Sequence, residues 1–195
     1  ELNKVFFEVI IANGFEQKAL KILKVKKNLR LIDASKFTTS RTFQSRSFNG
    51  NTLLQTKDEK KFFKENFRLV SKKKPNRLQY ENLLFAFNVC RFVKSNAIVL
   101  VSDKSTVGIG SGQPSRLDSS QIAIDKMKKF FNNKGEIVAA SDAFFPFIDG
   151  IEKLIQSGVS AVIQPEGSIR DKEIIKFADA TGTILIFSKT RHFKH

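Results

Sequence analysis

The sequence predicts an α/β domain in which helices cover both faces of a central sheet. Short apolar runs of strand length alternate with longer segments of helical periodicity along most of the chain. Such alternation favours parallel strands joined by crossover helices, a three-layer arrangement with the sheet in the middle. At 195 residues the chain is long enough for one substantial domain of this class, or two small ones, with a hydrophobic core.

The chain opens with the pattern of a strand, a helix and a second strand. Residues 9–12 (VIIA) form a short apolar run typical of a buried strand. Residues 15–26 place apolar side chains on one face and lysines on the other, as an amphipathic surface helix does. Residues 29–32 have the pattern of the next strand, so we expect these two strands to be parallel.

Residues 34–58 have a different composition. Thr, Ser and Arg alternate with phenylalanines, and Asn49-Gly50 is a turn signal ahead of the apolar run at 52–55. This pattern predicts a β-ribbon or an extended excursion. The lysine-rich residues 57–74 predict a solvated linker with one short element, and we place the boundary between two parts of the chain after residue 75.

The middle of the chain contains the strongest helical pattern. Asn76 can cap a helix that continues to about Val93. The following elements are predicted as a strand, a turn, a strand and a helix, at residues 97–101, 103–104, 106–109 and 118–131. In the last of these we expect three side chains to face inward: Ile122, Met127 and Phe130.

The rest of the chain continues the alternation. We expect strands at 137–140, 161–164 and 184–187, separated by helices at 149–156 and 168–180. Gly158 and Gly182 lie where helix C-caps belong. Ser168 and Asp171 resemble a capping box at the start of the last helix.

The segment 141–149, SDAFFPFID, is the most unusual stretch. Pro146 interrupts both a sheet ladder and a helix. Asp142 and Asp149 are costly to bury without partners. One interpretation is a loop rim whose aromatic walls receive a heteroaromatic ring. The other is a strand end that turns into a helix, with the phenylalanines filling the core.

The glycine-rich segment 108–113, GIGSGQ, follows a predicted strand and precedes a helix. The dinucleotide-binding fingerprint requires a third glycine where Gln113 stands. Two interpretations remain. The glycines permit a sharp exit from a hairpin, or a ligand lies against exposed backbone with Ser115 and Arg116 as an anion contact.

The composition excludes some classes of partner and site. A formal charge of +15 suggests a polyanion partner, whose affinity would fall steeply with salt. The lysines, however, are spread without repeat or aromatic interleaving, and Arg, which reads bases, is the minority. We therefore expect no nucleic-acid partner. The apolar runs are also too short to predict a membrane partner.

Cysteine and histidine are scarce. One Cys and two His cannot supply the ligands of a catalytic zinc, so we expect no zinc site. Cys90 cannot form an internal disulfide, which fits a reducing compartment such as the cytoplasm, and its place on the apolar face of the 76–93 helix predicts a small core residue. His192 and His195 are expected to be frayed terminal residues.

Several segments in order carry a resemblance to a known family: KSNAIV at 94–99, VGIGSGQPSR at 107–116, SDAFFPF at 141–147 and RHFKH at 191–195. The chain resembles the bifunctional purine-biosynthesis proteins, which join 5-aminoimidazole-4-carboxamide ribonucleotide (AICAR) transformylase to inosine monophosphate (IMP) cyclohydrolase. The resemblance covers the later part of the transformylase region.

The resemblance implies formyl transfer from the co-substrate 10-formyltetrahydrofolate to the amine of AICAR. It implies two zinc-free cytidine-deaminase-like subdomains, with residues 1–75 as a remnant of the first and 76–195 as the second. It also implies a homodimer and a potassium site near Asp142. The implied AICAR contacts are Asn96, Arg116, Phe144 and Arg191, with Asn96 orienting the reacting groups. The implied folate contacts are Leu117, Phe147, Asp149, Ser168 and Ile169.

The sequence also departs from the family. The catalytic Lys-His pair belongs to the earlier subdomain, and the one Lys-His dipeptide here, Lys194-His195, lies in the C-terminal motif instead. Ile148 replaces an Arg, Glu166 stands where Ser is common, and Lys194 replaces a His. We therefore expect part of a composite active site that is inactive alone. The alternative is a degenerate, non-catalytic interaction or regulatory module that retains the fold.

Overall fold

The structure, a computed structural model, describes residues 5–37, 43–59, 66–132 and 135–195. The chain forms two compact units that divide between Lys57 and Asp58. The second unit contains the sheet and core that position the candidate site.

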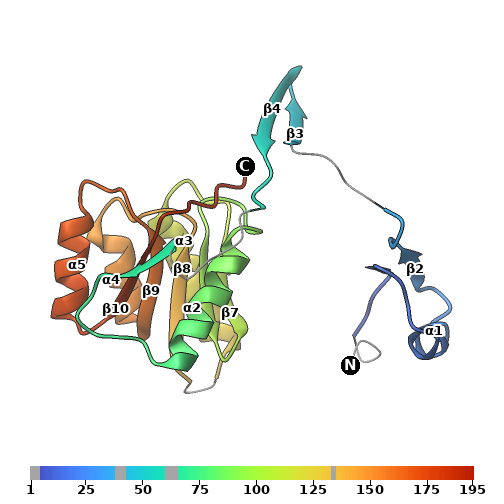
Figure 1. The fold of residues 1–195 in the computed structure, drawn as a ribbon, viewed down its shortest axis with the longest axis horizontal. Helices are drawn as coiled ribbons and strands as arrows, with labels where there is room; N and C mark the ends of the chain where they lie inside the picture. Colours follow the sequence, from blue (N-terminus) through green and yellow to red (C-terminus); the bar gives the residue numbers. More distant parts are fainter. Residues whose placement is uncertain (1–4, 38–42, 60–65, 133–134) are drawn as a thin grey trace. The chain divides into compact units, whose positions relative to one another are not determined.

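A six-stranded mixed sheet forms the centre of the second unit (Figure 1). Strands β8, β9 and β10 are parallel, whereas β6 is antiparallel to β7 and β8, and β5 is antiparallel to β10. The antiparallel pairs arise because β6 and β7 form a hairpin and β5 adds to the far edge. In spatial order the strands are β5 (Phe67–Leu69), β10 (Ile184–Ser188), β9 (Val159–Pro165), β8 (Ile137–Ser141), β6 (Ile98–Ser102) and β7 (Ser105–Gly110).

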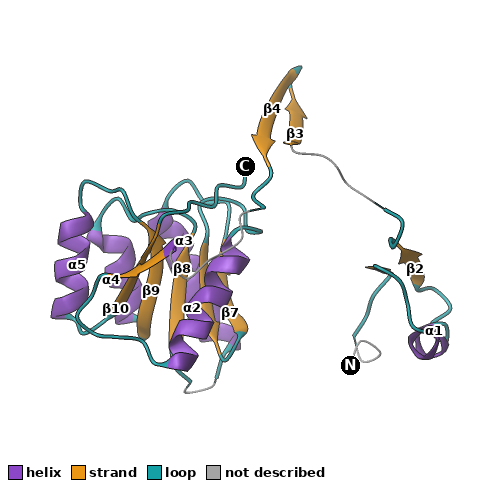
Figure 2. Ribbon diagram, in the orientation of Figure 1, coloured by secondary structure: helices purple, strands orange, loops and turns teal. Residues whose placement is uncertain are grey.

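Helices cover both faces of this sheet, which confirms the predicted three-layer α/β arrangement (Figure 2). On one face α2 (Arg77–Cys90) packs through Leu83 and Phe87. The other face carries α3 (Arg116–Phe130), α4 (Ile148–Gln156) and α5 (Asp171–Ala180). The central strands are buried on both sides, so β6, β8 and β10 are continuous apolar runs instead of alternating patterns.

Helix α2 begins as the sequence predicts. Asn76 accepts a hydrogen bond from the Gln79 amide (2.8 Å), and the Gln79 side chain accepts one from the Asn76 amide (2.9 Å), which completes a capping box. Cys90 at its other end is fully buried, which confirms the core assignment. Burial raises the pKa of the Cys90 thiol well above its usual value.

Helices α3 and α5 begin at residues other than those predicted, and α2 and α1 (Gln17–Leu23) are shorter than predicted. Helix α3 begins at Arg116 because Ser115 caps it, and Phe130 is 72% exposed where an inward side chain was expected. The chain leaves helical geometry at Phe131, which packs against the core instead. Helix α5 begins only at Asp171, because that carboxylate accepts from the amides of Gly167 (2.8 Å) and Ser168 (3.2 Å) in the preceding turn.

The predicted hairpin, with its turn at Asp103-Lys104, is confirmed. Both turn residues have positive φ (46° and 55°), as a tight hairpin turn requires. Gly112, with a φ of 68°, provides the predicted sharp exit from the hairpin, whereas Gly108 and Gly110 serve another purpose. A Cβ on Gly108 would lie 2.1 Å from Ala123 O, and one on Gly110 would lie 1.8 Å from Ser119 O, so both glycines allow α3 to approach β7 directly.

The segment expected to be a solvated linker contributes β5 to the edge of the sheet. Ile186 and Leu69 are register partners, and the amide of Leu185 donates to Ser71 Oγ (2.8 Å). Residues 60–65 of the same segment lie outside the described residues. The compact units therefore divide earlier in the chain than the boundary predicted after residue 75.

The first unit contains the predicted β-α-β opening and the predicted ribbon. Strands β1 (Val9–Ala12) and β2 (Arg30–Asp33) pair in parallel around α1 (Gln17–Leu23). Strands β3 (Phe43–Phe48) and β4 (Asn51–Thr56) form an antiparallel hairpin. Among the described residues of this unit, Leu23 is the only one that is buried.

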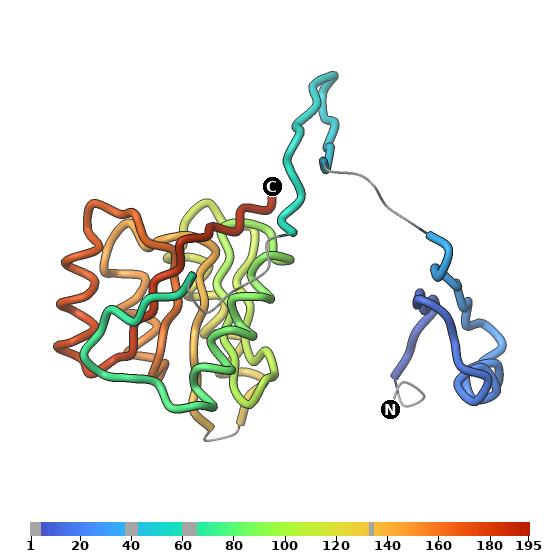
Figure 3. Tube along the Cα trace, viewed as in Figure 1, coloured from blue at the N-terminus to red at the C-terminus, as the bar shows by residue number. Residues whose placement is uncertain are grey.

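The C-terminal segment crosses from β10 toward the loop that precedes β6 (Figure 3). Ser95 donates its amide to Lys194 O (3.0 Å), and Lys194 donates its amide to Ser95 Oγ (3.2 Å). Within the described ranges, no helix is both long and apolar enough to cross a bilayer.

Candidate functional site

A cavity of about 370 Å³ lies in the second unit. The loops after β7 and β8 line it together with Asn96, which precedes β6 by two positions. Clefts at the carboxyl ends of parallel strands are the usual ligand sites of α/β sheets, and this volume is near the lower end of such cavities. Five of the residues singled out from the sequence line it: Asn96, Arg116, Leu117, Phe147 and Asp149. The other lining residues are Pro114, Ser115, Phe145, Pro146 and Gly150.

The loop after β8 combines both interpretations of its sequence. It is a strand end that turns into a helix, and Phe145 is fully buried in the core. Phe147, in contrast, is 53% exposed at the start of α4 and forms part of the cavity wall. Gly150 makes this arrangement possible, because a Cβ there would lie 2.8 Å from the Phe145 ring.

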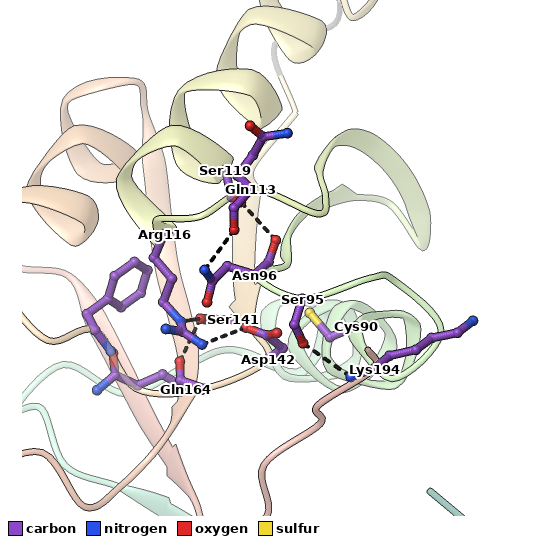
Figure 4. Close-up of polar contacts among 12 residues, drawn as sticks. Cys90, Ser95, Asn96, Gln113, Arg116, Ser119, Ser141, Asp142, Gln164 and Lys194 are labelled. Atoms are coloured by element: carbon purple, nitrogen blue, oxygen red, sulfur yellow. Dashed lines mark hydrogen bonds and ion pairs between the residues drawn. The ribbon is translucent and has the colours of Figure 1, made fainter. Parts of the chain in front are cut away.

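Arg116 is oriented by two side chains at the end of β8 (Figure 4). Its Nη2 donates to Asp142 Oδ1 (3.1 Å) and its Nε donates to Ser141 Oγ (3.3 Å). Asp142 is fully buried and the Arg116 side chain is 12% exposed, so the pair is shielded from water. Removing one partner of such a buried pair leaves an uncompensated charge, which makes the orientation of the guanidinium costly to change.

Asn96 also lines the cavity, and two hydrogen bonds hold it in place. Its Nδ2 donates to Gln113 O (2.8 Å), and Ser119 Oγ donates to Asn96 O (2.8 Å) (Figure 4). The Ser95–Asn96 peptide bond is cis. The bond to Gln113 O therefore fixes the orientation of the Asn96 side-chain amide.

Arg191 and Phe144, the other two predicted AICAR contacts, do not line the cavity but form a separate group. The Arg191 guanidinium carbon lies 4.9 Å from the centroid of the Phe144 ring, a cation–π distance. Gly167 makes room for this contact, since a Cβ there would lie 3.1 Å from Arg191 Nη2. The His192 amide donates to Asp142 O (2.8 Å), so Asp142 joins this segment to Arg116.

The remaining predicted folate contacts lie in the loop after β9 and do not line the cavity. Ile169 is fully exposed. Ser168 Oγ accepts from the amide of Arg170 (3.1 Å), whose guanidinium carbon lies 5.0 Å from the centroid of the Phe147 ring. Arg170 thus links this loop to the cavity wall.

His192 is not a frayed terminal residue. Its side chain is buried, its ring centroid lies 4.4 Å from that of Phe87, and its Nδ1 is hydrogen-bonded to Asp58. Burial lowers the pKa of His192 below its usual value, despite the opposing effect of Asp58. The prediction from chain position is wrong because the His192 imidazole is buried between Phe87 of α2 and Asp58, a residue far away in the sequence but close in space.

Two of the residues that differ from the family's usual residues form polar contacts in this structure. Glu166 forms an ion pair with Arg68 (2.7 Å), and Lys194 Nζ donates to Phe92 O (2.8 Å). In the part of the chain that the structure describes, no three His, Cys, Asp or Glu side chains gather closely enough to hold a metal ion.

Sequence reasoning missed several residues that shape the site, namely Asp58, Gln113, Ser119, Gly167 and Arg170. Each acts through a neighbour far away in the sequence or through a backbone atom. Two of them had a local signal: Gln113 lies inside the 107–116 motif, and Arg170 directly follows the predicted contacts Ser168 and Ile169.

Fold and site define an α/β domain with a ligand cavity lined by aromatic and charged side chains at its strand ends. A sequence profile of the AICARFT/IMPCHase bienzyme family matches residues 1–126. The chain therefore belongs to the AICARFT/IMPCHase bienzyme family.

Curated relatives agree with this assignment. The chain is 45% identical over 196 residues to the bifunctional purine biosynthesis protein PurH of Aquifex aeolicus. It is 43% identical over 196 residues to that of Leptospira biflexa, and 41% identical over 194 residues to that of Chlorobium chlorochromatii. Each comparison covers 100% of this chain and 37–38% of the relative, so the chain spans a little over a third of their length.

Proposed function

We propose that this chain is the second half of the transformylase region and supplies part of a composite active site in de novo purine biosynthesis. The reaction is transfer of the formyl group of 10-formyltetrahydrofolate to the AICAR amine. The zinc-free cytidine-deaminase-like fold, the homodimer and the cytoplasmic location belong to the same proposal. Family membership supports the pathway, and the cavity supports the reaction.

One observation carries the proposal. Residues assigned to different substrates line the same cavity: Asn96 and Arg116 for AICAR, and Leu117, Phe147 and Asp149 for the folate. A group transfer requires its two reactants in near contact, and holding them there supplies much of the rate enhancement. The volume of about 370 Å³ suits one ring-containing ligand more than two, which agrees with a site completed by residues outside this chain.

The AICAR side of the site follows from charge and shape. Arg116 and Arg191 suit the phosphate and carboxamide, because guanidinium groups form paired, charge-assisted hydrogen bonds with such oxygens. The Phe144 ring provides a flat apolar surface for the imidazole. Asn96 Oδ1 would accept a hydrogen bond from the AICAR amine. This bond would direct the lone pair of the amine nitrogen toward the formyl carbon.

Attack by the amine gives a tetrahedral intermediate, which collapses with expulsion of the tetrahydrofolate nitrogen. The amine loses a proton and the leaving nitrogen gains one, so the reaction requires a general acid and base. In the family this role belongs to the Lys-His pair of the earlier subdomain. This chain therefore positions the reactants and does not move the protons.

The folate side of the site uses the exposed part of the loop after β8. The half-exposed Phe147 ring suits stacking with the pterin, and Asp149 suits acceptance from pterin N–H groups. Ser168 and Ile169 would contact the folate beyond Arg170, which covers the Phe147 ring.

A potassium ion near Asp142 fits the donor atoms present. Asp142 Oδ2 is buried with no hydrogen-bond partner among the described residues, so a carboxylate oxygen is available. A bound cation would contact this second oxygen, beside the one that pairs with Arg116, and would hold the carboxylate in place.

Ligand titration followed by backbone and side-chain NMR tests the proposal. AICAR should shift signals of Asn96, Arg116, Phe144 and Arg191, and a 10-formyltetrahydrofolate analogue should shift those of Phe147 and Asp149. The chain alone should transfer no formyl group, and measurable turnover by it would contradict the partial-site assignment. If neither ligand shifts these residues, while the fold is intact, the assignment of these residues as AICAR and folate contacts is wrong.

A further inference from the structure

The last residues of the chain alternate in burial. Arg191 is exposed, His192 is 1% exposed, and Phe193 is 39% exposed. In an extended segment, successive side chains point to opposite sides. Burying His192 on the α2 side therefore directs Arg191 toward Phe144, over which its guanidinium lies.

His192 is held from two directions. Its ring packs against Phe87 of α2, and its Nδ1 bonds Asp58, the first residue of the second unit. Asp58 is itself fixed to the end of α2, because Arg91 Nη2 donates to Asp58 O (3.0 Å). The contact thus joins residues that are 134 positions apart in the sequence.

We propose that Asp58 and His192 are a positioning pair that sets the direction of Arg191 toward the bound AICAR. The inference rests on the proposed function, since it assigns a ligand to Arg191. Neither residue touches the ligand; both act through the C-terminal backbone, whose His192 amide donates to Asp142 O.

The charges around His192 agree with this role. Burial and Arg91 lower the pKa of the imidazole, whereas Asp58 and Asp142 act in the opposite direction, and burial dominates. The imidazole is therefore neutral near pH 7, and its Nδ1–H donates to the Asp58 carboxylate. Such a bond fixes the ring orientation as well as the position of the segment.

Hydrogen exchange of the His192 amide tests the anchor directly. In Asp58→Ala we expect exchange of this amide to be about tenfold faster, because the segment opens more often. Asp58→Asn, which retains an oxygen acceptor for Nδ1–H, should exchange nearly as slowly as the unaltered chain. His195→Gln is the matched control, since it alters an exposed imidazole of the same segment and should change nothing. Equal exchange in Asp58→Ala and the unaltered chain would overturn the proposal.

A double-mutant cycle on AICAR affinity tests whether the pair acts through Arg191. We expect Asp58→Ala and Arg191→Ala each to weaken AICAR binding about tenfold, with little further loss in the double variant. Affinity for the folate analogue and the melting temperature should change little. Additive losses would mean that Asp58 acts by another route, and they would overturn the inference.

The two proposals fail in different ways. If the unaltered chain binds AICAR but Asp58→Ala leaves its affinity unchanged, only the positioning pair is wrong. If the unaltered chain does not bind AICAR, the proposed function fails, and the role of the pair toward AICAR fails with it. Hydrogen exchange then still decides whether Asp58 anchors the segment.

Discussion

At the scale of single residues, close packing explains the glycines of β7. A side chain at Gly110 would overlap the backbone oxygen of Ser119 in α3. The Ser119 hydroxyl in turn donates a hydrogen bond to Asn96 O. We therefore expect Gly110→Ala to lower the free energy of unfolding by about 3 kcal/mol, because the helix must move away from the strand. Urea denaturation measures the change. Ser105→Ala, at the exposed end of the same strand, is the control and should stay within about 0.5 kcal/mol.

Neighbouring phenylalanines of one loop should have separate effects. Phe145→Ala removes a fully buried ring and should cost about 3–5 kcal/mol of stability. Phe147→Ala removes a half-exposed ring, so it should leave stability nearly unchanged while weakening binding of a folate analogue. Thermal unfolding and titration of both variants separate these effects. A large loss of stability in Phe147→Ala would show that this ring belongs to the core.

The buried thiol of Cys90 should be inert. Burial raises its pKa, so the protonated form dominates at pH 8, and the thiolate is the form that reacts. We expect no modification by a thiol reagent under native conditions and complete modification in urea. Rapid labelling of the native chain would contradict the buried position.

At the scale of elements, the edge strand β5 depends on a side chain just beyond it. Ser71 is buried, and its Oγ accepts the amide of Leu185 in β10. Ser71→Ala leaves that amide without its partner, so we expect a loss of about 1–3 kcal/mol in the free energy of unfolding. Faster hydrogen exchange at Leu185 would locate the effect, and unchanged exchange there would argue against it.

At the scale of the whole molecule, the two units should differ in stability. The second unit contains both hydrophobic clusters, whereas Leu23 is the only buried residue among those described in the first. We therefore expect residues 58–195 to unfold cooperatively at nearly the melting temperature of the whole chain. Residues 1–57 alone should show the circular dichroism of an unfolded peptide. A cooperative transition in the short fragment would contradict this expectation.

The exposed apolar residues of the first unit explain why it should be unstable alone. Val9, Ile11 and Ile32 on the paired strands remain 43–64% exposed. Parallel strands are normally covered on both faces. The chain spans only 37–38% of its relatives' length.

Local sequence determined most of the elements, because caps, turns and periodicity act over a few residues. The capping box at Asn76, the tight turns at Asn49-Gly50 and Asp103-Lys104, and the apolar strands all followed from residues adjacent in the chain. The motifs at 107–116 and 141–147 likewise identified residues that the structure brings to one cavity.

Tertiary structure alone decided the partners. Gly110 must be glycine because α3, another element, lies directly against it. The burial of His192 depends on Phe87 and Asp58. Residues 67–69 form an edge strand because they pair with β10. Packing and burial depend on which surfaces meet in space. A local pattern specifies how a segment folds, but the meeting of distant segments determines which side chain becomes a wall, an anchor or a ligand contact.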